Sequence, residues 1–104
     1  MALRLPGSTD LSMRGRTGLE VLDYEIVEEM ATALGAAGRK VEQVMARLHA
    51  HSGDAESRKA LLKEAAAAVY AYFIQRELCG LRRHQDAIRE YRIPNEVLVR
   101  LGAN

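Results

Sequence analysis

The chain has 104 residues, of which 48 % are hydrophobic and 28 % are charged. This length and composition are typical of one folded domain and exclude an intrinsically disordered chain. The formal net charge of +1 argues against a dedicated polyanion-binding protein, so we do not expect nucleic acid as a partner. Cys79 is the only cysteine, which excludes an intrachain disulfide.

The charges are distributed unevenly along the chain. Residues 17–53 carry six acids against three bases, whereas residues 82–104 carry five arginines against three acids. Opposite charge at the two ends favours attraction between them within the fold.

The sequence has no features of an export signal or a membrane span. Arg4, Pro6 and Gly7 stand where a signal peptide would need its apolar run. The longest apolar stretch, residues 65–74, has half the length that a bilayer-spanning helix needs. We therefore expect a cytoplasmic protein that makes no contact with membranes.

Residues 1–16 mix proline, glycine, serine and arginine without any hydrophobic period, which predicts a flexible N-terminal arm. A single helical domain is expected to occupy residues 17–104. It begins with a capping box, in which the Thr17 hydroxyl and the Glu20 carboxylate each accept from a free backbone N–H of the first turn.

The first predicted helix spans residues 18–50. Its apolar residues recur every three or four positions and are Leu19, Leu22, Ile26, Met30, Leu34, Ala37, Val41, Val44 and Leu48. Gly35 and Gly38 lie within this range, and each glycine costs about 1 kcal/mol relative to alanine. Because the stripe keeps its phase across them, we expect one continuous helix, with the glycines marking the close approach of another backbone.

The second predicted helix follows the turn at residues 52–54. Asp54 is a good N-cap, the helix runs from Ala55 to about Cys79, and Gly80 is its C-cap. A connection this short makes the two long helices an antiparallel hairpin.

Two short helices are expected to follow. One runs from residue 81 or 82 to Tyr91, and the last covers residues 94–101. Pro94 stands at the first position of the last helix and Gly102 lies just beyond its end. With no strand-forming segment, the fold class is all-α.

The second helix carries more apolar surface than one neighbour can cover. Tyr70, Tyr72 and Ile74 point away from the stripe that meets the first helix. We therefore expect a homodimer in which two hairpins form a four-helix bundle across a two-fold axis. The alternative is a compact monomer whose helices bend enough to bury their own faces.

No motif of a known enzyme class is present, so no catalytic residue, cofactor or metal ligand is expected. The most informative polar residues are Arg76 and Glu77, which flank the buried stripe of the second helix and are costly there unless paired. One interpretation is an ion pair of Arg76 with Asp23 or Glu29 that sets the helix register. The other is a small-ligand pocket formed by Asp23, Arg76, Glu77 and His84.

Two other groups of residues have the outline of a functional site, and a physical argument stands against each. His49, His51 and Asp54 cluster at the turn between the long helices, but residues two apart on a helix point to different sides, which argues against a metal site. Residues 85–101 have the outline of a helix-turn-helix. Their apolar side chains, however, predict a clip that docks on the hairpin, with Arg100 as the one exposed base of the last helix.

Three stretches of the sequence resemble a small, uncharacterised bacterial family of all-helical proteins. They are Gly18-Leu19-Glu20-Val21-Leu22-Asp23-Tyr24-Glu25, then Tyr72-Phe73-Ile74-Gln75-Arg76-Glu77-Leu78-Cys79-Gly80-Leu81, and Tyr91-Arg92-Ile93-Pro94 with Glu96-Val97-Leu98 and Leu101-Gly102. The resemblance implies a bacterial, cytoplasmic protein and supplies neither an activity nor a site residue.

The function that the sequence favours is therefore a non-catalytic helical module that associates with itself or with another protein. The first alternative is a DNA-binding regulator that uses the basic C-terminal helices. The second is a small-ligand-binding protein or an enzyme that uses the region of Arg76 and Glu77.

Overall fold

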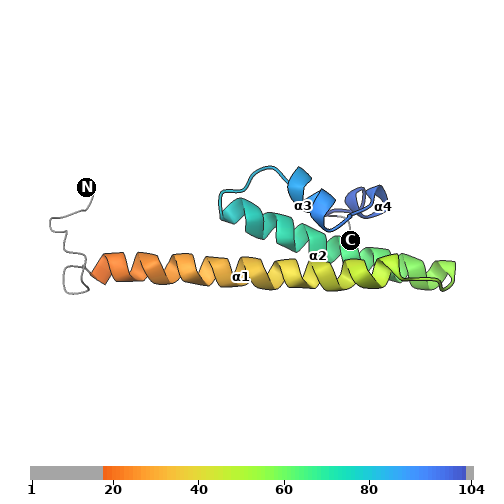
Figure 1. Ribbon diagram of the computed structural model, residues 1–104, viewed down its shortest axis with the longest axis horizontal. Coiled ribbons are helices and arrows are strands. Elements are labelled where there is room, and N and C mark those ends of the chain that lie inside the picture. Colours follow the sequence, from red (N-terminus) through yellow and green to blue (C-terminus); the bar gives the residue numbers. More distant parts are fainter. Residues whose placement is uncertain (1–17, 103–104) are drawn as a thin grey trace. The chain divides into compact units, whose positions relative to one another are not determined.

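The computed structural model describes residues 18–102, which contain helices and no strand (Figure 1). The all-α prediction is confirmed for this part of the chain. The helices are α1 Gly18–His49, α2 Ala55–Leu78, α3 Gln85–Glu90 and α4 Asn95–Leu98. The predicted arm at residues 1–16 and the capping residue Thr17 lie outside the described residues.

The chain divides into two compact units, Met1–Met30 and Ala31–Asn104. α1 contributes to both units, because it runs as one helix from Gly18 to His49. The predicted continuity through Gly35 and Gly38 is confirmed.

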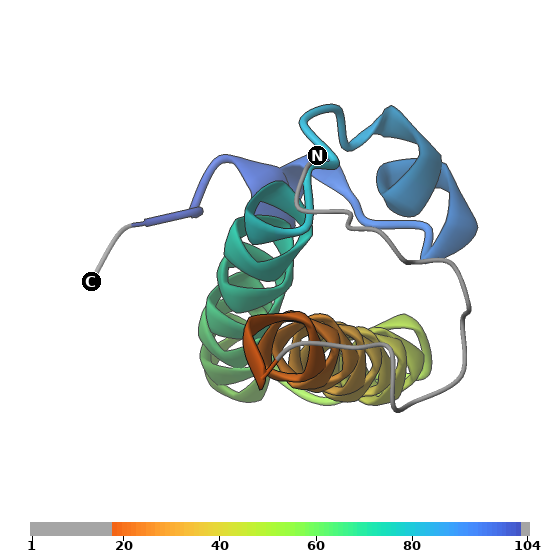
Figure 2. The ribbon, with the colours of Figure 1, turned by 90° about the vertical axis from the view of Figure 1, so that its left-hand side faces the viewer.

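The core of the second unit lies between the C-terminal half of α1, α2 and the segment that carries α3 and α4 (Figures 1 and 2). α2 runs back along α1 after a short turn, so the predicted antiparallel hairpin is confirmed within this unit. The core is built from Val41, Val44, Met45, Leu48, Leu61, Leu62, Ala65, Ala66, Ala68, Val69, Tyr72, Phe73, Ala87, Ile93 and Val97.

Local chemistry defines both ends of α2. The Asp54 carboxylate accepts a hydrogen bond of 2.9 Å from the Ser57 backbone N–H, and this bond lowers the pKa of Asp54. At the other end Gly80 has a φ of +89°, a conformation that glycine adopts without strain. The N–H groups of Gly80 and Leu81 donate to the carbonyl oxygens of Glu77 and Arg76, which completes a Schellman motif.

The two short helices are shorter than predicted. The third helix begins at Gln85, because the chain leaves the left-handed turn at Gly80 as a loop that continues to His84. The last helix ends at Leu98, and Pro94 is its extended N-cap residue (φ −80°, ψ 161°), not its first helical residue.

The C-terminal segment closes one side of the α1–α2 hairpin, as predicted for a docking clip. Val97 of α4 is fully buried in the core. His49 Nε2 of α1 lies 3.0 Å from the carbonyl oxygen of Arg92, and Arg58 of α2 forms a 2.5 Å ion pair with Glu96. The segment is therefore attached to both long helices.

Gly38 faces two aromatic side chains, so the prediction of an approaching backbone at both glycines is wrong. A Cβ atom on Gly38 would lie 3.3 Å from Tyr91 Oη and 3.4 Å from Tyr72 Cε1. At Gly35 the nearest group is the Arg39 guanidinium, at 3.4 Å.

Tyr72 was predicted to point outward and is instead 7 % exposed. Burial, followed by the hydrogen bond to Tyr72, raises the pKa of Tyr91 to about 12.

Alanine substitutions at the two glycines should therefore have different effects. Gly35→Ala should raise the free energy of unfolding by about 1 kcal/mol, because the methyl group meets only a long, adjustable side chain. Gly38→Ala should gain clearly less or lose stability, because two packed rings must move. Chemical denaturation of both variants measures the difference. Equal gains would show that the rings leave room at Gly38.

Candidate functional site

Arg76, Glu77 and His84 form a hydrogen-bonded cluster at the C-terminal end of α2. Arg76 Nε donates to His84 Nδ1 at 3.1 Å, and Arg76 Nη2 donates to the carbonyl oxygen of Arg83 at 2.8 Å. His84 Nε2 lies 2.9 Å from Glu77 Oε2. Because an arginine can only donate, His84 Nδ1 must accept, and the ring proton is on Nε2, from which it is donated to Glu77.

Aromatic contacts hold the same histidine in place. The imidazole of His84 stacks on Phe73 with ring centroids 4.1 Å apart, and the Arg76 guanidinium lies 5.7 Å from the centre of the Tyr72 ring. The His84 side chain is only 15 % exposed. The cluster therefore attaches the loop after α2 to the helix. The side chains of Arg76, Glu77 and His84 are hydrogen-bonded within this attachment.

Asp23 is the remaining residue of the predicted ligand pocket. It is exposed on α1 and belongs to the first unit, as does Glu29. The pairing of Arg76 with either acid, and a pocket that includes Asp23, stay predictions.

The two histidines near the inter-helix turn make separate contacts. His51 Nε2 lies 2.8 Å from the Ser57 hydroxyl, whereas His49 contacts the Arg92 carbonyl oxygen. Asp54 is occupied as the N-cap of α2. Within residues 18–102, no group of three or more His, Cys, Asp or Glu side chains is arranged to hold a metal ion.

The C-terminal segment lacks the helix lengths of a DNA-reading motif. α3 has six residues and α4 has four, so α4 is about one turn long. Its central residue Val97 is buried, and Arg100 Nη1 donates to the carbonyl oxygen of Glu96 at 2.6 Å. Arg89 on α3 is paired with Asp86 at 2.8 Å. This geometry does not present a helix that could enter a major groove.

An apolar face of α2 lies in solvent and is not explained by the packing of the second unit. Tyr70, Ile74 and Leu78 follow one another at intervals of four residues and are 47 %, 41 % and 64 % exposed. Ala67 and Ala71 lie on the same side of the helix and are also exposed. We call these five residues the outer face of α2. Because the opposite side of α2 is buried in the core, the helix is apolar on both sides, as helices covered on both sides are.

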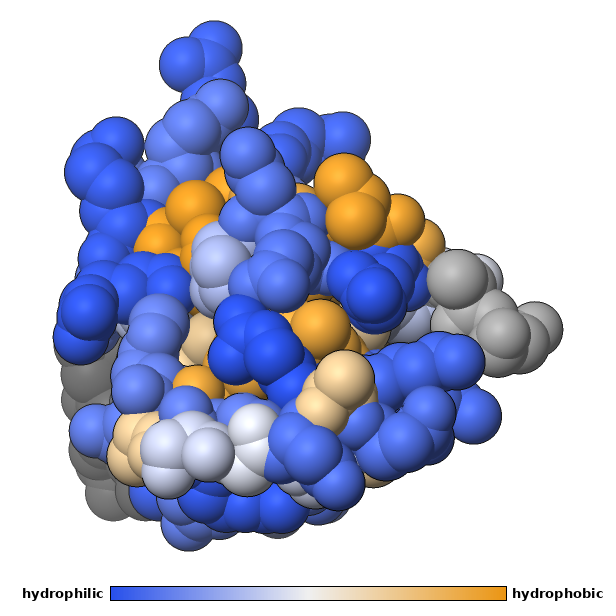
Figure 3. All heavy atoms as spheres, turned by 90° about the vertical axis from the view of Figure 1, so that its right-hand side faces the viewer, coloured by the Kyte–Doolittle hydropathy of each residue, from blue (hydrophilic) through white to orange (hydrophobic). Residues whose placement is uncertain are grey.

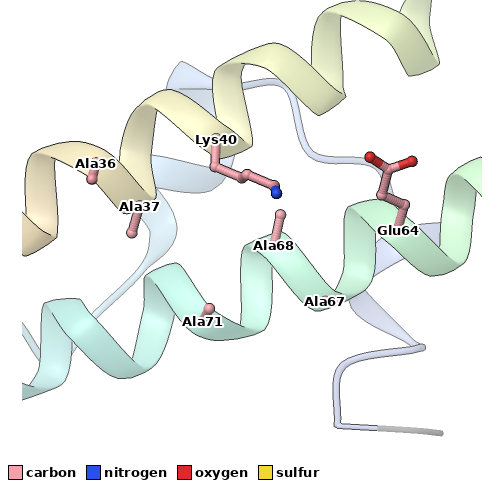
Figure 4. A pocket seen from close by; sticks show the side chains of 7 residues that line it. All are labelled: Ala36, Ala37, Lys40, Glu64, Ala67, Ala68 and Ala71. Atoms are coloured by element: carbon pink, nitrogen blue, oxygen red, sulfur yellow. The ribbon is translucent and has the colours of Figure 1, made fainter.

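A shallow groove adjoins the outer face of α2 (Figure 4). It has a volume of about 450 Å³ and is open to solvent. We call it the alanine groove, because it is lined by Ala36, Ala37 and Lys40 of α1 and by Glu64, Ala67, Ala68 and Ala71 of α2. Two of its residues, Ala67 and Ala71, also belong to the outer face, so the two features form one continuous surface. Small side chains allow a further helix to approach closely there.

The acids at the edge of this surface are already engaged. Arg47 binds both oxygens of Glu64, at 2.7 Å and 3.0 Å, and this interaction lowers the pKa of the Glu64 carboxyl group. Glu77 is hydrogen-bonded to His84. Lys40 extends from α1 toward α2 across the groove (Figure 4).

The alanine groove was missed by the sequence reasoning. From the sequence, residues 65–74 are interpreted only as an apolar stretch too short to span a bilayer, although small residues in pairs on both helices could have indicated a close-packing surface. Exposed Tyr70 and Ile74 were predicted correctly.

The surface at the turn between α1 and α2 is more hydrophilic than the outer face of α2. Figure 3 shows that hydrophilic side chains cover most of it and that the hydrophobic side chains form small patches between them. Scattered patches of this kind are normal on protein surfaces. No helix within residues 18–102 is long and apolar enough to span a membrane.

Comparison with known proteins assigns the chain to a family but not to an activity. Residues 1–104 match the family described as "Family of unknown function (DUF6665)". No curated protein and no solved structure matches the chain.

Proposed function

The chain belongs to this family of unknown function, and we propose that it is a non-catalytic, cytoplasmic module that forms a homodimer. The outer face of α2 and the alanine groove would be its interface. The observation that carries the proposal is that α2 has an exposed apolar face although its other side already fills the core.

A covered outer face is physically more favourable than an exposed one. Burial of apolar surface stabilises by about 25 cal/mol per Å², and soluble monomers rarely expose large contiguous apolar patches. A short chain of 104 residues also has a thin core of its own. Dimer formation adds to that core without lengthening the chain.

A second copy of the chain is the occupant that these features favour. A face used by both copies closes a two-fold dimer and leaves no free binding surface. The alanines of the groove permit close helix packing, and two hairpins together give the four-helix bundle expected from the sequence.

The proposal predicts a dimer that a charge in the groove disrupts. Light scattering at low micromolar concentration should give twice the 11.5 kDa chain mass. Ala71→Glu should weaken dimerisation at least about tenfold, because it places a carboxylate in the apolar interface.

Ala46→Glu is the matched control, because Ala46 is also an exposed alanine inside a long helix but does not line the groove. This variant should dimerise like the unchanged chain. A monomer mass at high concentration, or equal dimerisation of the two variants, would contradict the proposal.

A further inference from the structure

We infer that the helix covering the outer face of α2 and the alanine groove is residues 18–30 of α1 from the second copy, and that the exchange is reciprocal. We call residues 18–30 the acidic segment. This inference rests on the proposed homodimer and specifies which surfaces meet in it.

The acidic segment has an apolar stripe that the single chain leaves in solvent. Leu19, Leu22 and Ile26 lie three and four residues apart, on one side of the helix, and all three are about half exposed or more. Further along α1 the same stripe, continued by Val41 and Val44, is buried in the core. The acidic segment therefore has the hydrophobic pattern of a helix that packs against a neighbour, but its apolar stripe is exposed to solvent.

Charge distinguishes between the possible arrangements of two copies. The acidic segment contains five acids and no base; they are Glu20, Asp23, Glu25, Glu28 and Glu29. If the segments of two copies packed against each other through this stripe, Asp23 and Glu29 would lie close to the same carboxylates of the second copy, because each stands about 60° around the helix from Ile26. Like charges at that place are unfavourable.

The surroundings of the outer face of α2 are basic. Residues 59–83 carry five bases against two acids; four of the bases are exposed, and the fifth, Arg76, is held in the cluster with His84. The two acids are Glu64, which is bound by Arg47, and Glu77, which is hydrogen-bonded to His84. Lys40 lines the alanine groove, Lys63 stands four residues before Ala67 on α2, and Arg82 and Arg83 follow the end of α2; all four residues are exposed. An acidic, apolar helix is complementary to this surface.

Size and length also match. The acidic segment has 13 residues and is about 20 Å long, and the outer face of α2 over residues 67–78 is about 18 Å long. The branched side chains of Leu22 and Ile26 on the segment would meet alanines in the groove. Large residues opposite small ones allow two helices to interdigitate.

Cross-linking between two different chains tests this arrangement. One chain carries Ile26→Cys, the other carries Ala71→Cys, and both carry Cys79→Ser so that no other thiol remains. The isotopically labelled and unlabelled chains are mixed, treated with a short bis-maleimide and analysed by mass spectrometry. A link between positions 26 and 71, joining one chain of each kind, should form several-fold more than in the control pair.

The control pair replaces Ile26→Cys by Val27→Cys. Val27 lies in the same segment and is 61 % exposed, but it points about 100° around the helix from Ile26, away from the apolar stripe. Equal yields for positions 27 and 26, or a dominant link between two copies of position 26, would overturn the inference.

Salt provides an independent measurement on the unchanged chain. Between about 0.05 M and about 0.5 M salt the dimer should weaken about tenfold, because screening removes the attraction between acidic and basic surfaces. A dimer that tightens with salt indicates that like-charged segments meet, which overturns the inference but leaves the homodimer. A monomer under all conditions overturns the proposed function itself.

Discussion

Replacing Val97 with aspartate should lower the free energy of unfolding by about 3–5 kcal/mol. Val97 is 0 % exposed and belongs to the core, where α4 packs against α2. An unpaired carboxylate at this position would lose its hydration without gaining a partner, and groups of this kind are among the most destabilising in proteins. Chemical denaturation at one fixed protein concentration measures the loss, because the stability of a dimer depends on concentration.

Val99→Asp is the matched control for this variant. Val99 follows α4 directly and is 76 % exposed, so the same substitution should change stability by no more than about 0.5 kcal/mol. If the two variants had similar stability, the C-terminal segment would not be docked on the hairpin. In that case α3 and α4 would be free of the hairpin, and the DNA-binding alternative would be favoured again.

Arg76→Met should lower the free energy of unfolding by about 1–3 kcal/mol, the second-largest effect expected. The variant keeps an apolar stem beside Tyr72 and removes the hydrogen bonds to His84 Nδ1 and to the Arg83 carbonyl oxygen. Hydrogen bonds that involve a charged group contribute roughly 1.5–3 kcal/mol, less where solvent can replace the partner.

A double-mutant cycle separates the Arg76–His84 contact from the other effects of the substitution. His84→Phe retains a ring that can stack on Phe73 but has no acceptor for Arg76. Arg76→Met should therefore cost about 1 kcal/mol less in that background. Full additivity would show that the two side chains are not coupled.

The size of the loss also tests the ion pair predicted from the sequence. A loss of about 3–5 kcal/mol would indicate that Arg76 compensates a buried carboxylate, as proposed for Asp23 or Glu29. The contacts within the second unit involve a neutral imidazole nitrogen and a backbone carbonyl oxygen, which predict the smaller value.

The sequence alone determined the features that depend on neighbouring residues along the chain. The unbroken hydrophobic period predicted α1 through Gly35 and Gly38, and the side chain of Asp54 and the backbone freedom of Gly80 predicted the ends of α2. These are local effects of helix phase, capping and dihedral preference, so a sequence window of a few turns contains the information.

The tertiary structure decided which side chains meet across the chain. Tyr72 was predicted to point outward because only the apolar stripe of α2 that meets α1 was expected to be buried. In the second unit α2 packs against both α1 and the C-terminal segment. Tyr72 packs at Gly38 of α1, and the adjacent Phe73 stacks on His84 of the loop after α2. The buried part of the α2 surface is wider than predicted because the C-terminal segment also packs on it. The place where that segment docks is not encoded in the local sequence pattern of α2.

The same reason explains the candidate interface. The alanine groove exists because α1 and α2 bring Ala36 and Ala37 beside Ala67, Ala68 and Ala71, about thirty residues further along the chain. In the sequence these alanines indicate only that a helix is easy to form. These alanines form a surface only because the groove stays open when the C-terminal segment covers the other side of the hairpin. Which side is covered depends on how the whole chain packs, so it cannot be read from a short stretch of sequence.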